Sequence, residues 1–257
     1  RLDEELVPAS ASEVAASELA AAAQTLEAKP DEAAAAQPRS QRTRPVIVID
    51  PGHGGIDPGA GGSRAVEKDV VLAVGREIHR ALLATRRYDV SMTRASDVFV
   101  SLDQRVRISQ RLNADLFVSL HADSIAERAF TGSVRGATVY TLADTATDDQ
   151  TRAKVEKENA SDLLAGIAVG REQADDQVRS ILFDLMRRES SNFSSDFRTS
   201  LLGQMRPRIQ LARDPSRSGP FKVLRQPGSP AVLVELGYIS NPADEPQKPS
   251  PVWEKRI

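Results

Sequence analysis

The stretch Val46-Ile47-Val48-Ile49-Asp50-Pro51-Gly52-His53-Gly54-Gly55 decides how the rest of this chain is interpreted. Its first four residues are β-branched and apolar, which predicts a buried strand that is too short to be a helix. The Asp-Pro-Gly sequence that follows predicts a sharp turn. On this turn lies His53, one of three histidines in the chain. Open α/β sheets bind their ligands beyond the carboxyl ends of strands, so His53 is a candidate site residue.

A second apolar strand also runs directly into a histidine. Residues 114–123 read Ala-Asp-Leu-Phe-Val-Ser-Leu-His-Ala-Asp, which places His121 at the strand end. One histidine on a turn is more often a surface residue than a ligand, but two strands that both end in histidine favour a shared site. Asp123 could bind the same ligand or hold an imidazole from behind. The third histidine, His79, flanks the apolar stripe of a helix and is interpreted as a surface residue.

Two glutamates complete the set of candidates. Glu67 opens a helix predicted to run to about Thr85, and its position allows two interpretations: a carboxylate matched to the helix dipole, or a metal ligand facing His53. The glycine-rich loop between His53 and Glu67 lacks the spacing of phosphate and dinucleotide loops, so we reject nucleotide binding. Glu235 follows the apolar strand 231–234 and therefore also lies at a strand end.

Composition excludes several classes of protein. The 257 residues are 40% hydrophobic and 27% charged, which is enough for one sizeable core with residues left over. A net charge of −2 gives no basic footprint for nucleic acid. The absence of cysteine excludes thiolate metal sites, disulfides and thiol catalysis. No run approaches the roughly 18 apolar residues of a membrane span.

The chain is predicted to hold a tether and one domain. Residues 1–44 are rich in Ala, Glu, Gln and Pro with few large apolar residues, which predicts a flexible tether rather than a docked helix. Residues 45–257 predict a single α/β domain with a twisted, largely parallel central sheet flanked by helices. Residues 141–205 predict a helical insertion, with a mostly polar helix at 149–164 and a longer helix at 174–204. The strands are expected at 46–49, 88–92, 114–120, 136–140, 221–224 and 231–234.

As a set, these motifs resemble the zinc-dependent N-acetylmuramoyl-L-alanine amidases of bacterial cell-wall turnover. The resemblance runs in order from about Pro45 to Asp244 and rests on the blocks 50–55, 57–60, 67–69, 119–123 and 234–241. It implies a zinc ion held by His53, Glu67 and His121, with Glu235 as the catalytic glutamate. The implied reaction cleaves the amide between the lactyl group of N-acetylmuramic acid and the L-alanine of the stem peptide.

The residue types suit this chemistry even when the resemblance to the family is set aside. Two imidazoles and one carboxylate, with water in a fourth position, form a catalytic zinc arrangement. Zinc lowers the pKa of bound water and polarises a carbonyl. At a strand end, Glu235 could take the proton from attacking water and pass it to the leaving amine. The alternative for Glu235 is a strand-end salt bridge.

The resemblance extends to the division amidases of Gram-negative bacteria, in which an inserted helix inhibits the enzyme until an activator protein displaces it. It therefore implies peptidoglycan as substrate, an activator as partner and the periplasm as location. Glu156 and Glu158 in the polar helix are the candidates for reaching the zinc, and the sequence does not choose between them. The alternative is that the polar face of this helix is simply exposed to solvent. The chain opens on an acidic segment without Met, so we interpret it as a fragment of an exported protein that lacks its signal peptide.

Three other functions remain open at the level of sequence. The chain could be another zinc peptidase of wall peptides, a non-catalytic wall-binding scaffold on the same fold, or a protein with a purely structural zinc closed by Asp123 or an insertion glutamate. Loss of Glu235 or of a zinc ligand would favour the scaffold, and all four residues are present. At the C-terminus, Asn241 and Pro242 predict the start of a last helix, which the later prolines would shorten or displace.

Overall fold

The computed structural model describes residues 42–61, 65–122, 135–167, 177–226 and 228–237, all within one compact unit that begins at residue 35. The predicted tether up to residue 41, the candidate ligand Asp123 and the predicted last helix at Asn241 lie outside the described residues, so these remain predictions. In the ranges given above, no helix is both long and apolar enough to cross a membrane.

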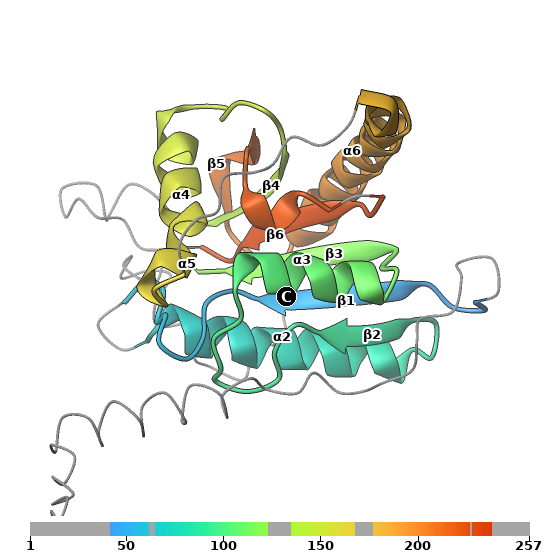
Figure 1. The fold of residues 1–257 in the computed structure, drawn as a ribbon. Coiled ribbons are helices and arrows are strands. Elements are labelled where there is room, and N and C mark those ends of the chain that lie inside the picture. Colours follow the sequence, from blue (N-terminus) through green and yellow to red (C-terminus); the bar gives the residue numbers. More distant parts are fainter. Residues whose placement is uncertain (1–41, 62–64, 123–134, 168–176, 227, 238–257) are drawn as a thin grey trace, which may run out of the picture. The chain divides into compact units, whose positions relative to one another are not determined.

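A six-stranded sheet in the order β2-β1-β3-β6-β4-β5 forms the centre of the fold (Figure 1). Neighbouring strands run parallel, except that β4 and β6 are antiparallel. The predicted α/β class with a largely parallel sheet is therefore confirmed. The strands are β1 (Val46–Pro51), β2 (Asp89–Met92), β3 (Leu116–His121), β4 (Ala137–Leu142), β5 (Leu211–Gly219) and β6 (Ala231–Glu235).

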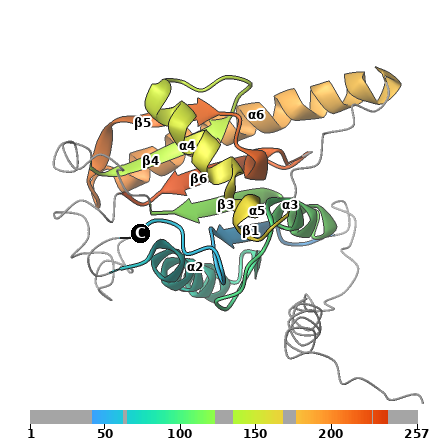
Figure 2. The same ribbon diagram turned by 60° about the vertical axis from the view of Figure 1, so that its left-hand side comes forward.

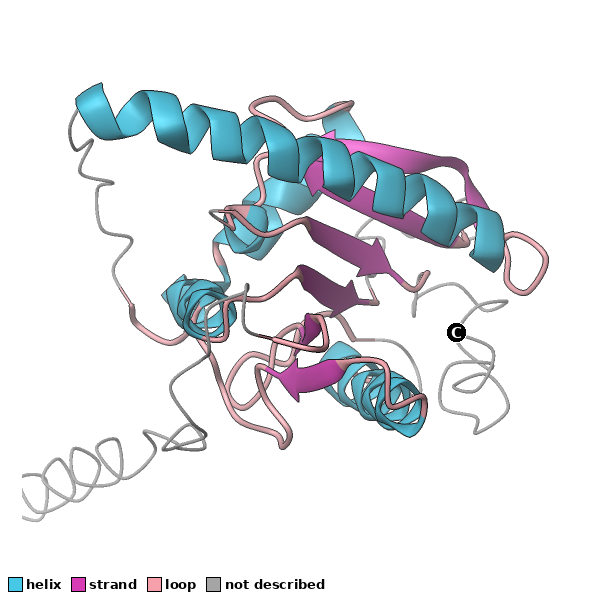
Figure 3. Ribbon diagram, turned by 90° about the vertical axis from the view of Figure 1, so that its right-hand side faces the viewer, coloured by secondary structure: helices cyan, strands magenta, loops and turns pink. Residues whose placement is uncertain are grey.

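The alternation of side chains along β1 divides the core into two layers. Ile47 and Ile49 belong to one apolar cluster together with residues of α2 (Glu67–Ala84) and α6 (Gln177–Met205). Val46 and Val48 belong to a second cluster, with residues of α3 (Leu102–Arg111), α4 (Asp149–Asn159) and the 3-10 helix η3 (Lys222–Leu224). Figure 3 shows the long helix α6 crossing the strands on one side of the sheet.

Two local predictions are wrong. Residues 221–224 were expected to form a strand, but they contain η3, and Phe221, Val223 and Leu224 are buried there. A short apolar run does not distinguish a buried strand from a buried turn, which explains the error. The strand that was not predicted is β5, which is largely polar and contains Pro215. It is the edge strand beside β4, and only an edge position readily accepts proline.

The helices agree more closely with the sequence pattern. Ser101 caps α3 as predicted, because its side chain accepts from the Gln104 N–H and the Gln104 side chain accepts from the Ser101 N–H. The polar helix expected at residues 149–164 is present as α4 followed by the short helix α5 (Ser161–Leu164). Figure 2 shows α4 and α5 following one another over the sheet.

Candidate metal centre

Three adjacent parallel strands end side by side and carry three of the candidate residues. His53 lies just beyond β1, His121 is the last residue of β3, and Glu235 is the last residue of β6. His121 and Glu235 are direct partners in the register of β3 and β6. The sheet therefore brings residues that are far apart in sequence to one edge, where open α/β folds bind their ligands.

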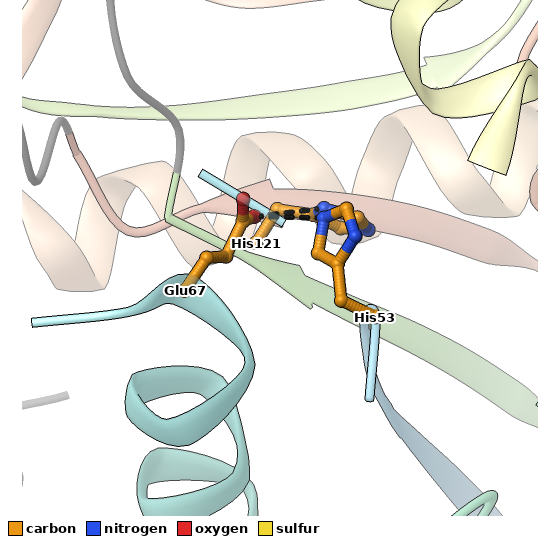
Figure 4. A group of neighbouring side chains, drawn as sticks. All are labelled: His53, Glu67 and His121. Atoms are coloured by element: carbon orange, nitrogen blue, oxygen red, sulfur yellow. Dashed lines mark hydrogen bonds and ion pairs between the residues drawn. The ribbon is translucent and has the colours of Figure 1, made fainter. Parts of the chain in front are cut away.

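Glu67 joins the two histidines from the first turn of α2 (Figure 4). Its Oε1 lies 3.2 Å from Nε2 of His53 and 3.1 Å from Nδ1 of His121. The backbone N–H groups of Ala60 and Ala122 donate to its two oxygens at 2.7 and 2.8 Å. All three side chains are buried, and within the described ranges they form the one cluster whose donor atoms converge as metal ligands do.

Glycine is required at two positions beside this cluster. A Cβ on Gly59 would lie 2.7 Å from both Oε2 of Glu67 and Cδ2 of His53, and a Cβ on Gly52 would lie 2.5 Å from the ring of His121. Gly59 also has a φ of +67°, which side chains rarely adopt. His53 itself has a φ of 57°, an uncommon value for a residue other than glycine. Its loop is therefore held in shape by the residues around it.

Two buried arginines hold the turn that carries His53. Arg105 donates to the carbonyl oxygens of Pro51 and His53, each at 2.8 Å, and forms an ion pair with Asp50 at 2.6 Å. Arg94 donates from Nε to the Pro51 carbonyl at 2.9 Å. These donors satisfy carbonyl groups of an irregular buried turn, which would otherwise be costly to bury.

Asp57 orients the ring of His53 by contacting Nδ1, the ring nitrogen opposite the one that faces Glu67. Its Oδ2 lies 2.8 Å from Nδ1 of His53. A proton on Nδ1 leaves the opposite nitrogen, Nε2, to bind a metal, which is the usual role of a carboxylate behind a liganding histidine. Burial opposes a charged imidazole, but the carboxylate of Glu67 and the hydrogen bond to Asp57 raise the pKa of His53 to about 10. The charged imidazole carries a proton on each ring nitrogen, and a metal ion at Nε2 would compete with the proton there.

Glu158 approaches the same histidines from α4. Its Oε2 lies 3.4 Å from Nε2 of His53 and 3.3 Å from Nδ1 of His121. Burial opposes its ionisation, but His121, Lys154 and His53 outweigh burial and lower the pKa of Glu158. Glu156, the other candidate on this helix, is exposed. The fold thus brings Glu158, and not Glu156, to the cluster.

Four donor-atom distances match the spacing of ligands on a tetrahedral metal ion such as zinc. The distances from the two histidine nitrogens to Oε1 of Glu67 and Oε2 of Glu158 range from 3.1 to 3.4 Å. Two ligands on tetrahedral zinc, with bonds of about 2.0–2.1 Å, are separated by roughly 3.3 Å. In addition, the buried Nε2 of His53 makes no hydrogen bond within the described part of the chain. Mixed nitrogen and carboxylate donors suit zinc better than calcium or magnesium.

Glu235 is fully buried beside this cluster and contacts a lysine of α4. Its Oε2 lies 2.6 Å from Nζ of Lys154, and the same ammonium group lies 3.3 Å from Oε1 of Glu158. Sequence reasoning missed Lys154, although its spacing of four residues from Glu158 puts both on one helix face. It also missed the roles of Asp57 and Arg105, whose contacts only the fold reveals.

Comparison with known proteins identifies the family. A family model described as N-acetylmuramoyl-L-alanine amidase matches residues 47–257, a range that includes every residue of the cluster. The chain belongs to this family. The resemblance to this amidase family that the sequence motifs indicated is therefore confirmed.

Individual relatives agree with the family match. The chain is 35% identical over 202 residues to the N-acetylmuramoyl-L-alanine amidase AmiA of Escherichia coli, covering 78% of this chain and 68% of that protein. It is 38% identical over 207 residues to the amidase AmiC of Neisseria meningitidis, but spans only 47% of that protein. Among solved structures, the amidase AmiC2 of Nostoc punctiforme superposes with a TM-score of 0.54 at 27% identity, over 82% of this chain and 89% of that one.

Proposed function

We propose that this chain is a zinc-dependent peptidoglycan amidase that cleaves the amide between the lactyl group of N-acetylmuramic acid and the L-alanine of the stem peptide. The observation that carries the proposal is the buried group His53, Glu67 and His121 with Glu235 on the adjoining strand end. Membership of the amidase family, and relatives named for this reaction, support the same substrate.

The proposed chemistry divides between the metal and the protein. His53, Glu67 and His121 would hold the zinc ion, which when bound supplies a Lewis acid that polarises a carbonyl and lowers the pKa of water. Glu235 takes a proton from the attacking water and delivers it to the leaving nitrogen. Its complete burial and its pairing with His121 in the sheet support this role. Water oxygen bonds to the acyl carbon, the C–N bond breaks, and the products separate as a carboxylate and an ammonium group.

We also propose that α4 inhibits the enzyme. Oε2 of Glu158 contacts the ring nitrogens of both histidines, so in the proposed reaction it stands where water or the substrate carbonyl would reach a bound metal. The cavity lined by His53, His121 and Glu158 is small, with a volume of about 20 Å³. The end of α4 is fixed because Asn159 donates to the Pro220 carbonyl at 3.0 Å and accepts from the Lys222 N–H at 2.8 Å.

An inhibited enzyme needs a means of release, so we propose an activator protein as a partner. Such a partner shifts the equilibrium only if it binds the form with α4 displaced more tightly than the closed form. Because peptidoglycan lies outside the cytoplasmic membrane, we further propose a periplasmic location. The resemblance to the division amidases of Gram-negative bacteria leads us to propose a role in cell division. Fractionation of a Gram-negative cell that produces the protein tests the location, and recovery from the cytoplasm alone would contradict it.

Digestion of purified peptidoglycan tests the catalytic proposal. The zinc-loaded chain carrying Glu158→Gln, and a form that lacks residues 148–170, should release stem peptides that begin with L-alanine and leave the glycan strands intact. Mass spectrometry identifies these products. A chelator, or an added Glu235→Gln substitution, should abolish release. Cleavage within the stem peptides would indicate a wall peptidase instead, and no release from folded, zinc-loaded protein would indicate a wall-binding scaffold.

A further inference from the structure

We propose that α4 inhibits this enzyme as an internal analogue of the reaction products, with Lys154 and Glu158 standing in for the two groups that hydrolysis creates. This inference rests on the proposed function and assigns a new part to Lys154. Lys154 is buried, and its ammonium group lies 2.6 Å from Glu235 and 3.3 Å from Glu158. Lys154 thus connects Glu235, at the end of β6, with Glu158, which contacts His53 and His121.

Hydrolysis of an amide yields one carboxylate and one ammonium group. The acyl carbon gains the water oxygen, and the nitrogen leaves with both protons of that water in addition to its own, once the acid has ionised. Immediately after cleavage the two charged groups are in contact. The carboxylate lies beside the metal ligands, and the ammonium group lies beside the residue that delivered the proton.

The contacts of α4 reproduce this arrangement group by group. Oε2 of Glu158 faces His53 and His121 at 3.4 and 3.3 Å, as a product carboxylate would. Nζ of Lys154 contacts Glu235, as the freed amine would. The remaining Glu158 oxygen, Oε1, and Nζ are 3.3 Å apart, longer than the roughly 2.7–2.9 Å of a tight charge-assisted hydrogen bond but still an ion pair of carboxylate and ammonium.

An ordinary helix salt bridge does not account for this geometry. Pairs of Lys and Glu four residues apart are common on solvated helix faces, where they contribute little. Lys154 and Glu158 lie instead on the buried face of α4, and Lys154 reaches across to the end of β6. Lys157 lies on the exposed face of the same helix and therefore serves as the control residue for Lys154.

The inference predicts that the freed amino terminus of a stem peptide binds where Lys154 now lies. The test uses the zinc-loaded full chain and the dipeptide L-alanyl-D-glutamate, with its N-acetylated form as the matched probe. Calorimetry should show that the Lys154→Met, Glu158→Gln double variant binds the free-amine dipeptide about tenfold or more tightly than the acetylated one. The chain with both residues intact should bind the free-amine dipeptide at least about tenfold more weakly than the variant does, because α4 already fills the site.

Two further measurements make the test specific. Adding Glu235→Gln to the double variant should remove the preference for the free amine. Hydrogen exchange of the α4 amides should accelerate in Lys154→Met and in the milder Lys154→Gln, but not in Lys157→Met. Equal binding of the two dipeptides by the folded double variant, or unchanged exchange in both Lys154 variants, would overturn the proposal. Release of stem peptides from peptidoglycan by the Glu158→Gln chain is scored separately, so failure of the product analogy is distinguishable from failure of the amidase function.

Discussion

His53 illustrates how much a single site residue depends on its neighbours. Its φ of 57° is uncommon for histidine, and its carbonyl oxygen accepts from Arg105 while its ring is fixed by Asp57. The energy needed to hold this conformation comes from contacts with Arg105 and Asp57, which lie outside the His53–Glu67–His121 cluster. We therefore expect the geometry of the candidate metal site to be sensitive to substitutions of these neighbouring residues.

At the residue scale, Asp57→Asn should weaken zinc binding by about 10–100-fold. The amide keeps the size of the side chain but removes the negative charge that holds the proton on Nδ1 of His53. Competition with a chromophoric chelator measures the affinity. Asp97→Asn is the control, because Asp97 holds the same loop through Gly55 and Lys68 instead of through a histidine. Equal zinc affinity in Asp57→Asn and wild type would show that Asp57 does not act on the metal site.

At the scale of elements, α4 differs from the other helices in what it buries. The buried residues of α4 are Thr151, Lys154, Val155 and Glu158, most of them polar. The buried face of α2 is instead almost entirely apolar apart from Glu67. Charged groups on a buried helix face are costly unless they find partners, and those of α4 find them in the His53–Glu67–His121 cluster and in Glu235. The helix thus places charged groups against the candidate site, as the proposed inhibition requires.

Glu158→Gln should raise the basal rate of stem-peptide release by about tenfold or more, because the neutral amide competes poorly with substrate for the histidine pair. Glu156→Gln, the same change two residues earlier on the exposed face, should leave the rate unchanged. The rates are measured by release of labelled peptide from peptidoglycan. A similar rise in both variants would point to general loosening of α4, and no rise in Glu158→Gln would argue against inhibition by this residue.

At the scale of the whole molecule, Asp50 links several elements beneath the site. The carboxylate lies in β1, accepts from Thr93 at 2.6 Å and from Ser119 of β3 at 2.7 Å, and pairs with Arg105 of α3. Burial opposes its ionisation, but Arg105 and the two hydroxyl donors outweigh burial and lower the pKa of Asp50. Folding therefore favours the ionised form of this group.

Asp50→Asn should lower the free energy of unfolding at neutral pH by about 3–5 kcal/mol, because Arg105 is left buried without its counter-charge. Since the folded-state pKa of Asp50 is below 3.8, its contribution is present above that pH and is lost as the pH falls through the folded pKa. The stability gap between wild type and variant should therefore narrow below about pH 4. Urea denaturation of wild type and variant, at neutral pH and below about pH 4, measures this difference in the free energy of unfolding. Asp103→Asn, at an exposed position, is the control. A gap that stays constant with pH would contradict the assignment.

The local pattern of the sequence was sufficient for the elements that begin or end at the site. Short runs of apolar residues predict β1, β3 and β6, and their carboxyl ends place His53, His121 and Glu235 at one edge, because parallel strands share a direction. Ser101 likewise predicts the start of α3 through local hydrogen bonding alone. These features depend on residues that are close in sequence, which is why they could be predicted from it.

Contacts between distant segments were decided only by the tertiary structure. The sequence offered Glu156 and Glu158 equally, and the choice depends on which face of α4 packs on the sheet. The same packing brings Lys154 to Glu235, and the buried turn brings Arg105 to the carbonyl of His53. The polar strand β5 forms because β4 supplies its hydrogen-bonding partner, and not because its own residues favour a strand. The sequence determined the chemistry available at the strand ends, whereas packing across long sequence separations determined which charged groups meet there.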